Sequence, residues 1–224
     1  MTDYILTKEK TDDKGKETDK EKEKYWNGES SELETKVVTN HIYYYSSVNK
    51  KSAQELNIKL KEVENKLLNK FKDCPQHQEY IYLHINSFGG SVFSAFSVID
   101  TIKNLKVPVV SIIEGAAASA ATLISVVCDY RIIYQTSYML IHQLSSGSWG
   151  KMSELEDEME NLKELMNAIR KIYKEHANIP DGEIDEILKH DIWWNSDIAL
   201  SKGLVDEIKH TDKHYKFSKG LITI

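Results

Sequence analysis

From Lys36 onward, the hydrophobic positions of the chain follow two alternating patterns. Short apolar runs, which are typical of strands, cover residues 42–45, 80–85, 109–113, 131–134 and 138–141. Between them, helices are predicted over residues 52–67, 92–103 and 116–128, the last almost wholly apolar. Strands that alternate with crossover helices indicate an α/β domain with a largely parallel sheet.

Local signals mark where these elements begin and turn. Ser52 and Glu55 have the spacing of a capping box, which places the start of the first helix at Ser52. Gly89 and Gly90 predict a sharp turn after the second strand, and Gly115 predicts a turn before the apolar helix. The chain is therefore expected to repeat a unit of strand, turn and helix.

A long helix is predicted over about residues 151–177, after a segment rich in glycine and serine. Its apolar side chains form one stripe from Leu155 to Tyr173, and its other faces are densely charged. About 24 helical residues at 1.5 Å each span about 36 Å, which exceeds a small core. Two interpretations stay open: the helix projects to meet another subunit, or it packs back on its own sheet.

The beginning of the chain has a different composition. Of the first 36 residues, 19 are Asp, Glu or Lys, and large apolar side chains are few. Such a segment cannot bury enough surface to order itself. We therefore predict a charged, disordered tail over residues 1–36 and one domain over residues 37–224. The alternative is a mobile segment that contacts a partner through Tyr4, Ile5 and Leu6.

Charge and cysteine content narrow the function classes. The formal net charge is −6, and the basic residues do not gather into a patch, so we expect no nucleic-acid partner. Two cysteines, Cys74 and Cys128, are too few for a disulfide framework or a structural zinc site. The sequence shows neither a signal-peptide pattern nor an uninterrupted apolar span. We expect a cytoplasmic protein without a membrane partner.

Ser119 and His142 are the first candidates for chemistry. Ser119 lies among small residues at the predicted start of a helix, where the helix dipole and backbone N–H groups stabilise an oxyanion. A serine among alanines is more often a packing residue, so Ser119 alone does not establish catalysis. His142, one of eight histidines, follows a predicted strand. Parallel α/β folds present their ligand-binding loops at that end, which suits a general base.

Two further segments complete the candidates. Asp191 lies between two helical patterns, and Trp193 and Trp194 could bury it beside an imidazole, whose tautomer a carboxylate fixes. A loop acid or a helix cap is the plainer interpretation of Asp191, and His190 beside it is a competing base. The turn at residues 86–90 has an unhindered backbone that could donate an N–H to a substrate. It lacks the glycine spacing of phosphate-binding loops.

In this order, the four segments resemble the motifs of the ClpP family of serine peptidases, the proteolytic subunits of Clp proteases. They read INSFGG at residues 85–90, GAAAS at 115–119, IHQL at 141–144 and DIWWNSDIALSKGLVD at 191–206. The resemblance spans about residues 40–208. It implies an α/β structure with the ClpP/crotonase-like fold of repeated β-α units and a projecting handle helix, here the long helix at about residues 151–177.

The resemblance implies a role for each matching residue. Ser119 would be the nucleophile, His142 the general base and Asp191 the acid that orients His142. Asp191 stands at the family's interval before the Gly-Leu-Val-Asp end of the last motif. It is therefore preferred to His190 and Asp197.

Further parts of the site follow from the same resemblance. The backbone N–H groups of Gly90 and Ala120 would form the oxyanion hole. A strand over residues 146–150 would pair with the substrate backbone through Ser146, Gly147, Ser148 and Trp149. No metal or organic cofactor is implied for this chain, because ATP would be used by a partner.

The function implied is that of a serine endopeptidase in a self-compartmentalised protease. Such a chain forms two stacked heptameric rings and degrades unfolded polypeptides that an AAA+ unfoldase delivers. One alternative is a catalytically silent ring subunit with a structural or regulatory role. Another is a relative of phage head-maturation proteases or signal peptide peptidases, which use a Ser-Lys dyad. The presence of His142 and Asp191 argues against this second alternative.

Three positions depart from the family pattern. Phe88 and Leu144 replace prolines beside the site, which changes local rigidity and leaves the reacting groups intact. His84 stands where an aromatic residue of the ATPase-docking pocket is usual. These departures bear on the choice of partner more than on catalysis.

Overall fold

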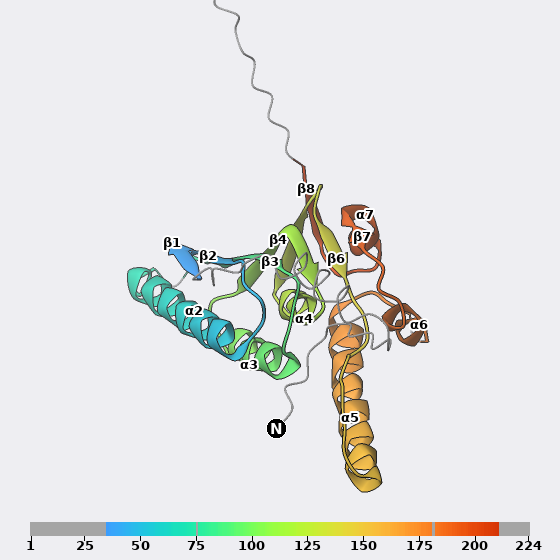
Figure 1. The fold of residues 1–224 in the computed structure, drawn as a ribbon. Helices are drawn as coiled ribbons and strands as arrows, with labels where there is room; N and C mark the ends of the chain where they lie inside the picture. Colours follow the sequence, from blue (N-terminus) through green and yellow to red (C-terminus); the bar gives the residue numbers. More distant parts are fainter. Residues whose placement is uncertain (1–34, 75, 181, 211–224) are drawn as a thin grey trace, which may run out of the picture.

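The computed structural model describes residues 35–210 except residues 75 and 181 (Figure 1). Its sheet contains β1 (Lys36–Val38), β2 (His41–Tyr44), β3 (Ile81–Ser87), β4 (Val109–Ala118), β5 (Tyr130–Tyr134), β6 (Tyr138–Leu140), β7 (Trp194–Asn195) and β8 (Glu207–Lys209). Its helices are α2 (Lys50–Lys70), α3 (Val92–Lys103), α4 (Ala120–Val126), α5 (Met152–His176), α6 (Ile184–Leu188) and α7 (Ser196–Ser201). Residues 1–34 of the predicted tail lie outside the described residues.

The sheet is largely parallel, as predicted. The strand order is β1-β2-β3-β4-β5-β8, and β6 pairs with the far end of β4. Only the β1–β2 and β6–β7 pairs of the described sheet are antiparallel. Strand β4 is the central element, because its first half pairs with β5 and its last residues pair with β6. This change of partner along β4 opens the edge where the candidate residues gather.

Helices α2, α3 and α4 lie on one side of the sheet (Figure 1). Ile42, Leu83 and Ile113 of three neighbouring strands are fully buried in the core, together with Leu56 and Leu60 of α2. The helical spacing of Leu56 and Leu60 in the sequence therefore predicted the buried face of α2 correctly.

The start of α2 corrects one prediction. The N-cap is Asn49, not Ser52, and the helix begins at Lys50. The Asn49 side chain accepts the Ser52 N–H at 2.9 Å, and Ser52 Oγ accepts the Asn49 N–H at 3.0 Å. Ser52 is thus the third helical residue of a capping box that begins three positions earlier. Glu55 instead accepts the backbone N–H of Thr35.

The boundary between β4 and α4 corrects a second prediction. Gly115 does not end the strand: its positive φ of 81° bends the chain while β4 continues through Ala118. Residues Ala116, Ala117 and Ala118 pair with β6, and α4 begins only at Ala120. Periodicity cannot distinguish a buried strand from a buried helix in an apolar run, which explains the error.

Helix α5 has two different halves. Near its C-terminus, Ile169 and Tyr173 are buried in the core of the domain. Toward its N-terminus the helix projects away from the sheet (Figure 1), and Met152 is 71% exposed. The apolar stripe predicted for this helix is therefore divided between its own domain, which covers the last two turns, and the surface. None of the helices in residues 35–210 is both long and apolar enough to cross a membrane.

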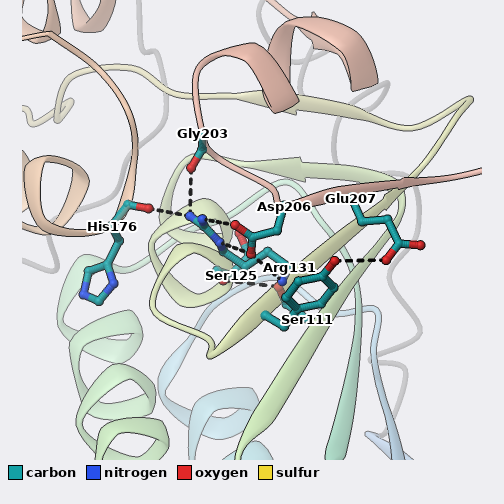
Figure 2. Close-up of polar contacts among 8 residues, drawn as sticks. Ser111, Ser125, Arg131, His176, Gly203, Asp206 and Glu207 are labelled. Atoms are coloured by element: carbon teal, nitrogen blue, oxygen red, sulfur yellow. Dashed lines mark hydrogen bonds and ion pairs between the residues drawn. The ribbon is translucent and has the colours of Figure 1, made fainter.

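Arg131 of β5 joins the end of α5 to the sheet (Figure 2). Its Nε and Nη2 donate to the two carboxylate oxygens of Asp206 at 2.9 and 2.6 Å. Its Nη1 donates to the carbonyl oxygens of Gly203, at 2.8 Å, and of His176. A bidentate guanidinium–carboxylate pair is stronger than a single charged hydrogen bond, and the two carbonyl oxygens add further bonds to the same side chain. Arg131 thus fixes the last turn of α5 against β5 and the start of β8.

Candidate active site

Three parallel neighbouring strands bring the candidate residues to one edge of the sheet. Strands β3 and β4 are paired as far as Ser87 and Ala117, and β4 and β6 as far as Ala118 and Leu140. The Gly-Gly turn follows β3, Ser119 follows β4, and His142 follows β6. Open α/β sheets bind ligands at the carboxyl ends of their strands.

Ser119 occupies a strained turn between β4 and α4. Its φ of 58° and ψ of −128° lie in a region that non-glycine residues rarely adopt, at a cost of about 1–3 kcal/mol. Its N–H donates to the Leu140 carbonyl at 2.8 Å, and its carbonyl accepts the Thr122 N–H at 3.0 Å. Serine nucleophiles also occupy strained strand-to-helix turns in α/β hydrolases. The local geometry of Ser119 therefore suits a nucleophile.

The glycine turn lies directly against this serine. Gly89 has a φ of 94°, and a Cβ added to it would lie 2.7 Å from the Cβ of Ser119 and 2.9 Å from the N of Ala120. Such contacts are far shorter than ordinary packing allows. Only glycine permits the turn to approach Ser119 so closely.

Val48 holds the other side of the turn. Its N–H donates to the Gly89 carbonyl at 2.8 Å, and its carbonyl accepts the Ser91 N–H at 2.7 Å. In a parallel bridge of this kind, the N–H of the intervening Gly90 points away from Val48. The Ala120 N–H opens α4 and has no acceptor within the helix. These two N–H groups are the candidate oxyanion donors.

His142 is paired with Asp191. Its Nδ1 lies 3.1 Å from Oδ1 of Asp191, and its side chain is buried. The pairing follows from the antiparallel register of β6 and β7, in which Met139 is opposite Trp194. Continued by three residues, this register places position 142 opposite position 191. A carboxylate at Nδ1 holds the proton there and leaves Nε2 as the acceptor that a general base needs.

The surroundings of Asp191 differ from the prediction. Its side chain is 34% exposed, so the two tryptophans do not bury it. Trp194 is partly buried against the core, and Trp193 meets the ring of Phe88 edge to face at 6.0 Å. Successive side chains of an extended segment point to opposite sides. The tryptophans therefore pack on both sides of the segment instead of enclosing the carboxylate.

The competing residues lie elsewhere. His190 is exposed, and its Nε2 lies 3.3 Å from a carboxylate oxygen of Glu186 on α6. Asp197 is in the first turn of α7, past β7, and is also exposed.

Residues 146–149 form no strand within this single chain, and their pairing with a substrate backbone stays a prediction. It runs along α5 in Figure 1, and Trp149 at its end is 98% exposed. A strand needs a partner for its N–H and C=O groups. Ser146, Gly147 and Ser148 have no ladder partner within the described chain.

Sequence reasoning missed three contributors to the site. Val48 and strand β7 have no distinctive local pattern, and their importance comes only from pairing. Thr122 left a weak signal, because it is a polar residue three positions after Ser119 in an apolar run. Its Oγ donates to the carbonyl of Ser119 at 2.6 Å.

Comparison with known proteins assigns the chain to a family. The family model described as Clp protease matches residues 29–212. The chain therefore belongs to the Clp protease family, and the resemblance found in the sequence is confirmed.

Individual relatives agree with this assignment. An ATP-dependent Clp protease proteolytic subunit of Deinococcus radiodurans is 28% identical over 138 residues, which cover 61% of this chain and 68% of the relative. The ATP-dependent Clp protease proteolytic subunit 2 of Treponema denticola is 27% identical over 199 residues, which cover 88% of this chain and 95% of the relative. A solved ClpP1 mutant from Listeria monocytogenes matches with a TM-score of 0.67 and 23% identity, covering 78% of this chain and 93% of that one. The predicted ClpP fold is thereby confirmed.

Proposed function

We propose that the chain is a serine endopeptidase, the proteolytic subunit of a Clp-type protease, with Ser119, His142 and Asp191 as its catalytic triad. The observation that carries the proposal is the strained Ser119 directly after β4, next to strand β6, which leads to His142. Nδ1 of His142 lies 3.1 Å from Asp191. Membership of the Clp protease family supports the same reaction class.

In the proposed reaction, Ser119 Oγ attacks the carbonyl carbon of a peptide bond while Nε2 of His142 takes the hydroxyl proton. Asp191 stabilises the imidazolium that forms and holds its orientation. The negative charge on the former carbonyl oxygen is bound by the N–H groups of Gly90 and Ala120.

The tetrahedral intermediate then loses the amine, which takes the proton from His142, and an acyl ester on Ser119 remains. A water molecule, deprotonated by His142, attacks this ester and releases the acid. Every proton in this cycle moves between serine, histidine, water and substrate. The chain itself needs no metal or organic cofactor for these steps.

The assembly proposed is two stacked heptameric rings of this chain in the cytoplasm, with an AAA+ unfoldase that uses ATP and delivers unfolded polypeptides. Neither nucleic acid nor a membrane is proposed as a partner. The exposed apolar residues of α5 support contact between copies of the chain, because Met152, Leu155 and Met159 project from the domain that buries Ile169 and Tyr173.

A fluorophosphonate probe tests the catalytic assignment. We expect the wild type to hydrolyse small peptides and to carry one label, on Ser119, and the Ser119→Ala variant to lose both label and activity. Ser125→Ala, which removes a buried serine hydroxyl of α4, should be labelled like the wild type. Labelling that persists in Ser119→Ala would refute the nucleophile. An assembled but unlabelled and inactive wild type would favour the silent ring subunit.

Sedimentation velocity tests the assembly. The double variant Leu155→Glu/Met159→Glu should split a tetradecamer into single rings or smaller species, because each carboxylate would be buried without a partner. Asp157→Lys is the matched control, since at 100° per residue position 157 lies on the opposite side of the helix. A monomeric wild type, or a double variant of unchanged mass, would contradict the role given to α5.

A further inference from the structure

We propose that Thr122 and Tyr173 are positioning residues that hold the backbone of Ser119 for reaction and tie it to α5. The inference rests on the proposed function, because it concerns the same nucleophile. Its basis is a continuous series of buried hydrogen bonds. Tyr173 OH lies 2.6 Å from Thr122 Oγ1, which lies 2.6 Å from the carbonyl oxygen of Ser119.

The direction of these bonds follows from the available protons. A carbonyl oxygen only accepts, so Thr122 Oγ1 donates its single proton to Ser119. The second bond must then be donated by the phenol of Tyr173. Both side chains are buried, and burial raises the pKa of the Tyr173 phenol. The phenol therefore stays protonated and remains a donor throughout the neutral pH range.

Ser119 needs such support because its positive φ is not its relaxed conformation. Its carbonyl accepts two bonds from Thr122, one from the N–H at 3.0 Å and one from the hydroxyl. Any residue except proline at position 122 makes the first of these. The second depends on the threonine hydroxyl and, through its orientation, on Tyr173. The side chains thus add a constraint that the helix backbone alone does not supply.

The series begins on the helix that projects from the domain. Tyr173 is one turn before His176, whose carbonyl accepts from Arg131, so the last turn of α5 is fixed to the sheet (Figure 2). The exposed half of the same helix carries the surface proposed for contact between subunits. A tilt of α5 on assembly would therefore change the Tyr173–Thr122 bond and, with it, the position of the Ser119 carbonyl.

Ser125 provides a matched control on the same helix. Its side chain is as buried as that of Thr122, and its Oγ donates to the Thr122 carbonyl at 3.0 Å. Ser125 also accepts from Ser111 through its carbonyl oxygen (Figure 2). Ser125→Ala thus removes a buried hydroxyl of the same helix without removing a donor to Ser119.

The test compares kcat, KM and probe-labelling rates of Thr122→Val, Tyr173→Phe, Thr122→Ser and Ser125→Ala. We expect Thr122→Val to lower kcat and the labelling rate by about 10- to 100-fold, the range that misplaced reacting groups produce, with little change in KM. Tyr173→Phe should have a smaller effect in the same direction. Thr122→Ser keeps the hydroxyl and should return to within about threefold of the wild type, and Ser125→Ala should do the same.

The double variant Thr122→Val/Tyr173→Phe should be no slower than Thr122→Val alone, because both changes act through one bond to Ser119. If Thr122→Val and Ser125→Ala have the same kcat, the pair only fills the core and the inference is overturned. The inference is also overturned if Thr122→Ser does not recover activity.

Amide hydrogen exchange gives a readout that does not depend on activity. Exchange of residues 119–122 should be faster in Thr122→Val and Tyr173→Phe than in Ser125→Ala, and equal rates would overturn the inference. Labelling of the wild type and of Ser119→Ala decides the proposed function separately. A failure of the nucleophile assignment and a failure of the positioning role therefore give different results.

Discussion

Two histidine–carboxylate pairs with nearly the same geometry lie in different regions of this chain. His142 Nδ1 is 3.1 Å from Asp191, and His84 Nδ1 is 2.8 Å from Glu114. Both imidazoles are buried, and both carboxylates are partly exposed. The pairs differ in what adjoins the second ring nitrogen: Nε2 of His84 lies 2.8 Å from Nδ1 of His41.

Position in the sheet explains the difference. His84 is in the middle of β3, and the neighbouring strands place Tyr43 against it, with the two rings stacked at 4.4 Å. Its surroundings are fixed by register, and a second imidazole occupies its other nitrogen. His142 instead follows the end of β6, beside the strained Ser119. A histidine–carboxylate pair therefore becomes a candidate catalytic site through its place at the strand ends, not through its own geometry.

The largest expected effect separates the two pairs by activity. Asp191→Asn should lower kcat by about 10⁴-fold, because His142 would then hold the wrong tautomer. Glu114→Gln should leave kcat within about twofold, since its partner His84 has no access to the nucleophile. Peptide hydrolysis by both variants measures this directly.

Two controls belong to the same measurement. If His190 or Asp197 were the true partner of His142, His190→Gln or Asp197→Asn would cost more activity than Asp191→Asn. A Glu114→Gln variant as slow as Asp191→Asn would show that the two pairs are not functionally distinct.

The sequence predicted the elements of this structure better than the contacts between them. Helix α3 has the predicted bounds because a serine cap precedes it and its apolar spacing is regular. The end of β4 was misplaced because residues 116–118 are apolar whether they form a strand or a helix. Asp191 was selected by its family motif, since the two-residue strand that sets its register is too short to show a pattern. The pair of His84 and Glu114 could not be predicted, because it depends on the register between β3 and β4.

A second prediction compares the stability of the two pairs, for which the opposite order of effects is expected. Glu114→Ala removes the acceptor of a buried imidazole and of the Tyr45 hydroxyl, so the free energy of unfolding should fall by about 1–3 kcal/mol. Asp191→Ala removes a more exposed carboxylate and should cost less than about 1 kcal/mol. Urea denaturation of both variants provides the two values. Equal losses would show that the pair of His142 and Asp191 is as important for stability as the pair of His84 and Glu114.

The smallest expected effect is on the pH dependence of folding stability, through His41 beside His84. The pKa of His41 is lowered, first by burial and then by the neighbouring His84 and Lys209, while Glu114 opposes the shift. The ring of His41 also stacks on Tyr82 at 4.6 Å. His41 is therefore neutral in the folded chain under conditions in which the unfolded chain already binds a proton.

The sign of the pH effect follows from this difference in proton binding. The contribution of His41 to stability is complete above its unfolded pKa of about 6.5 and is lost as the pH falls toward its lower folded pKa. Solvent screens the partly exposed ring, so the loss should be well under about 1 kcal/mol. The free energy of unfolding of the wild type should fall more steeply below pH 6.5 than that of His41→Gln. Parallel curves for the two proteins would contradict the assignment, and a change in kcat with His41→Gln would contradict the separation of the two histidine pairs.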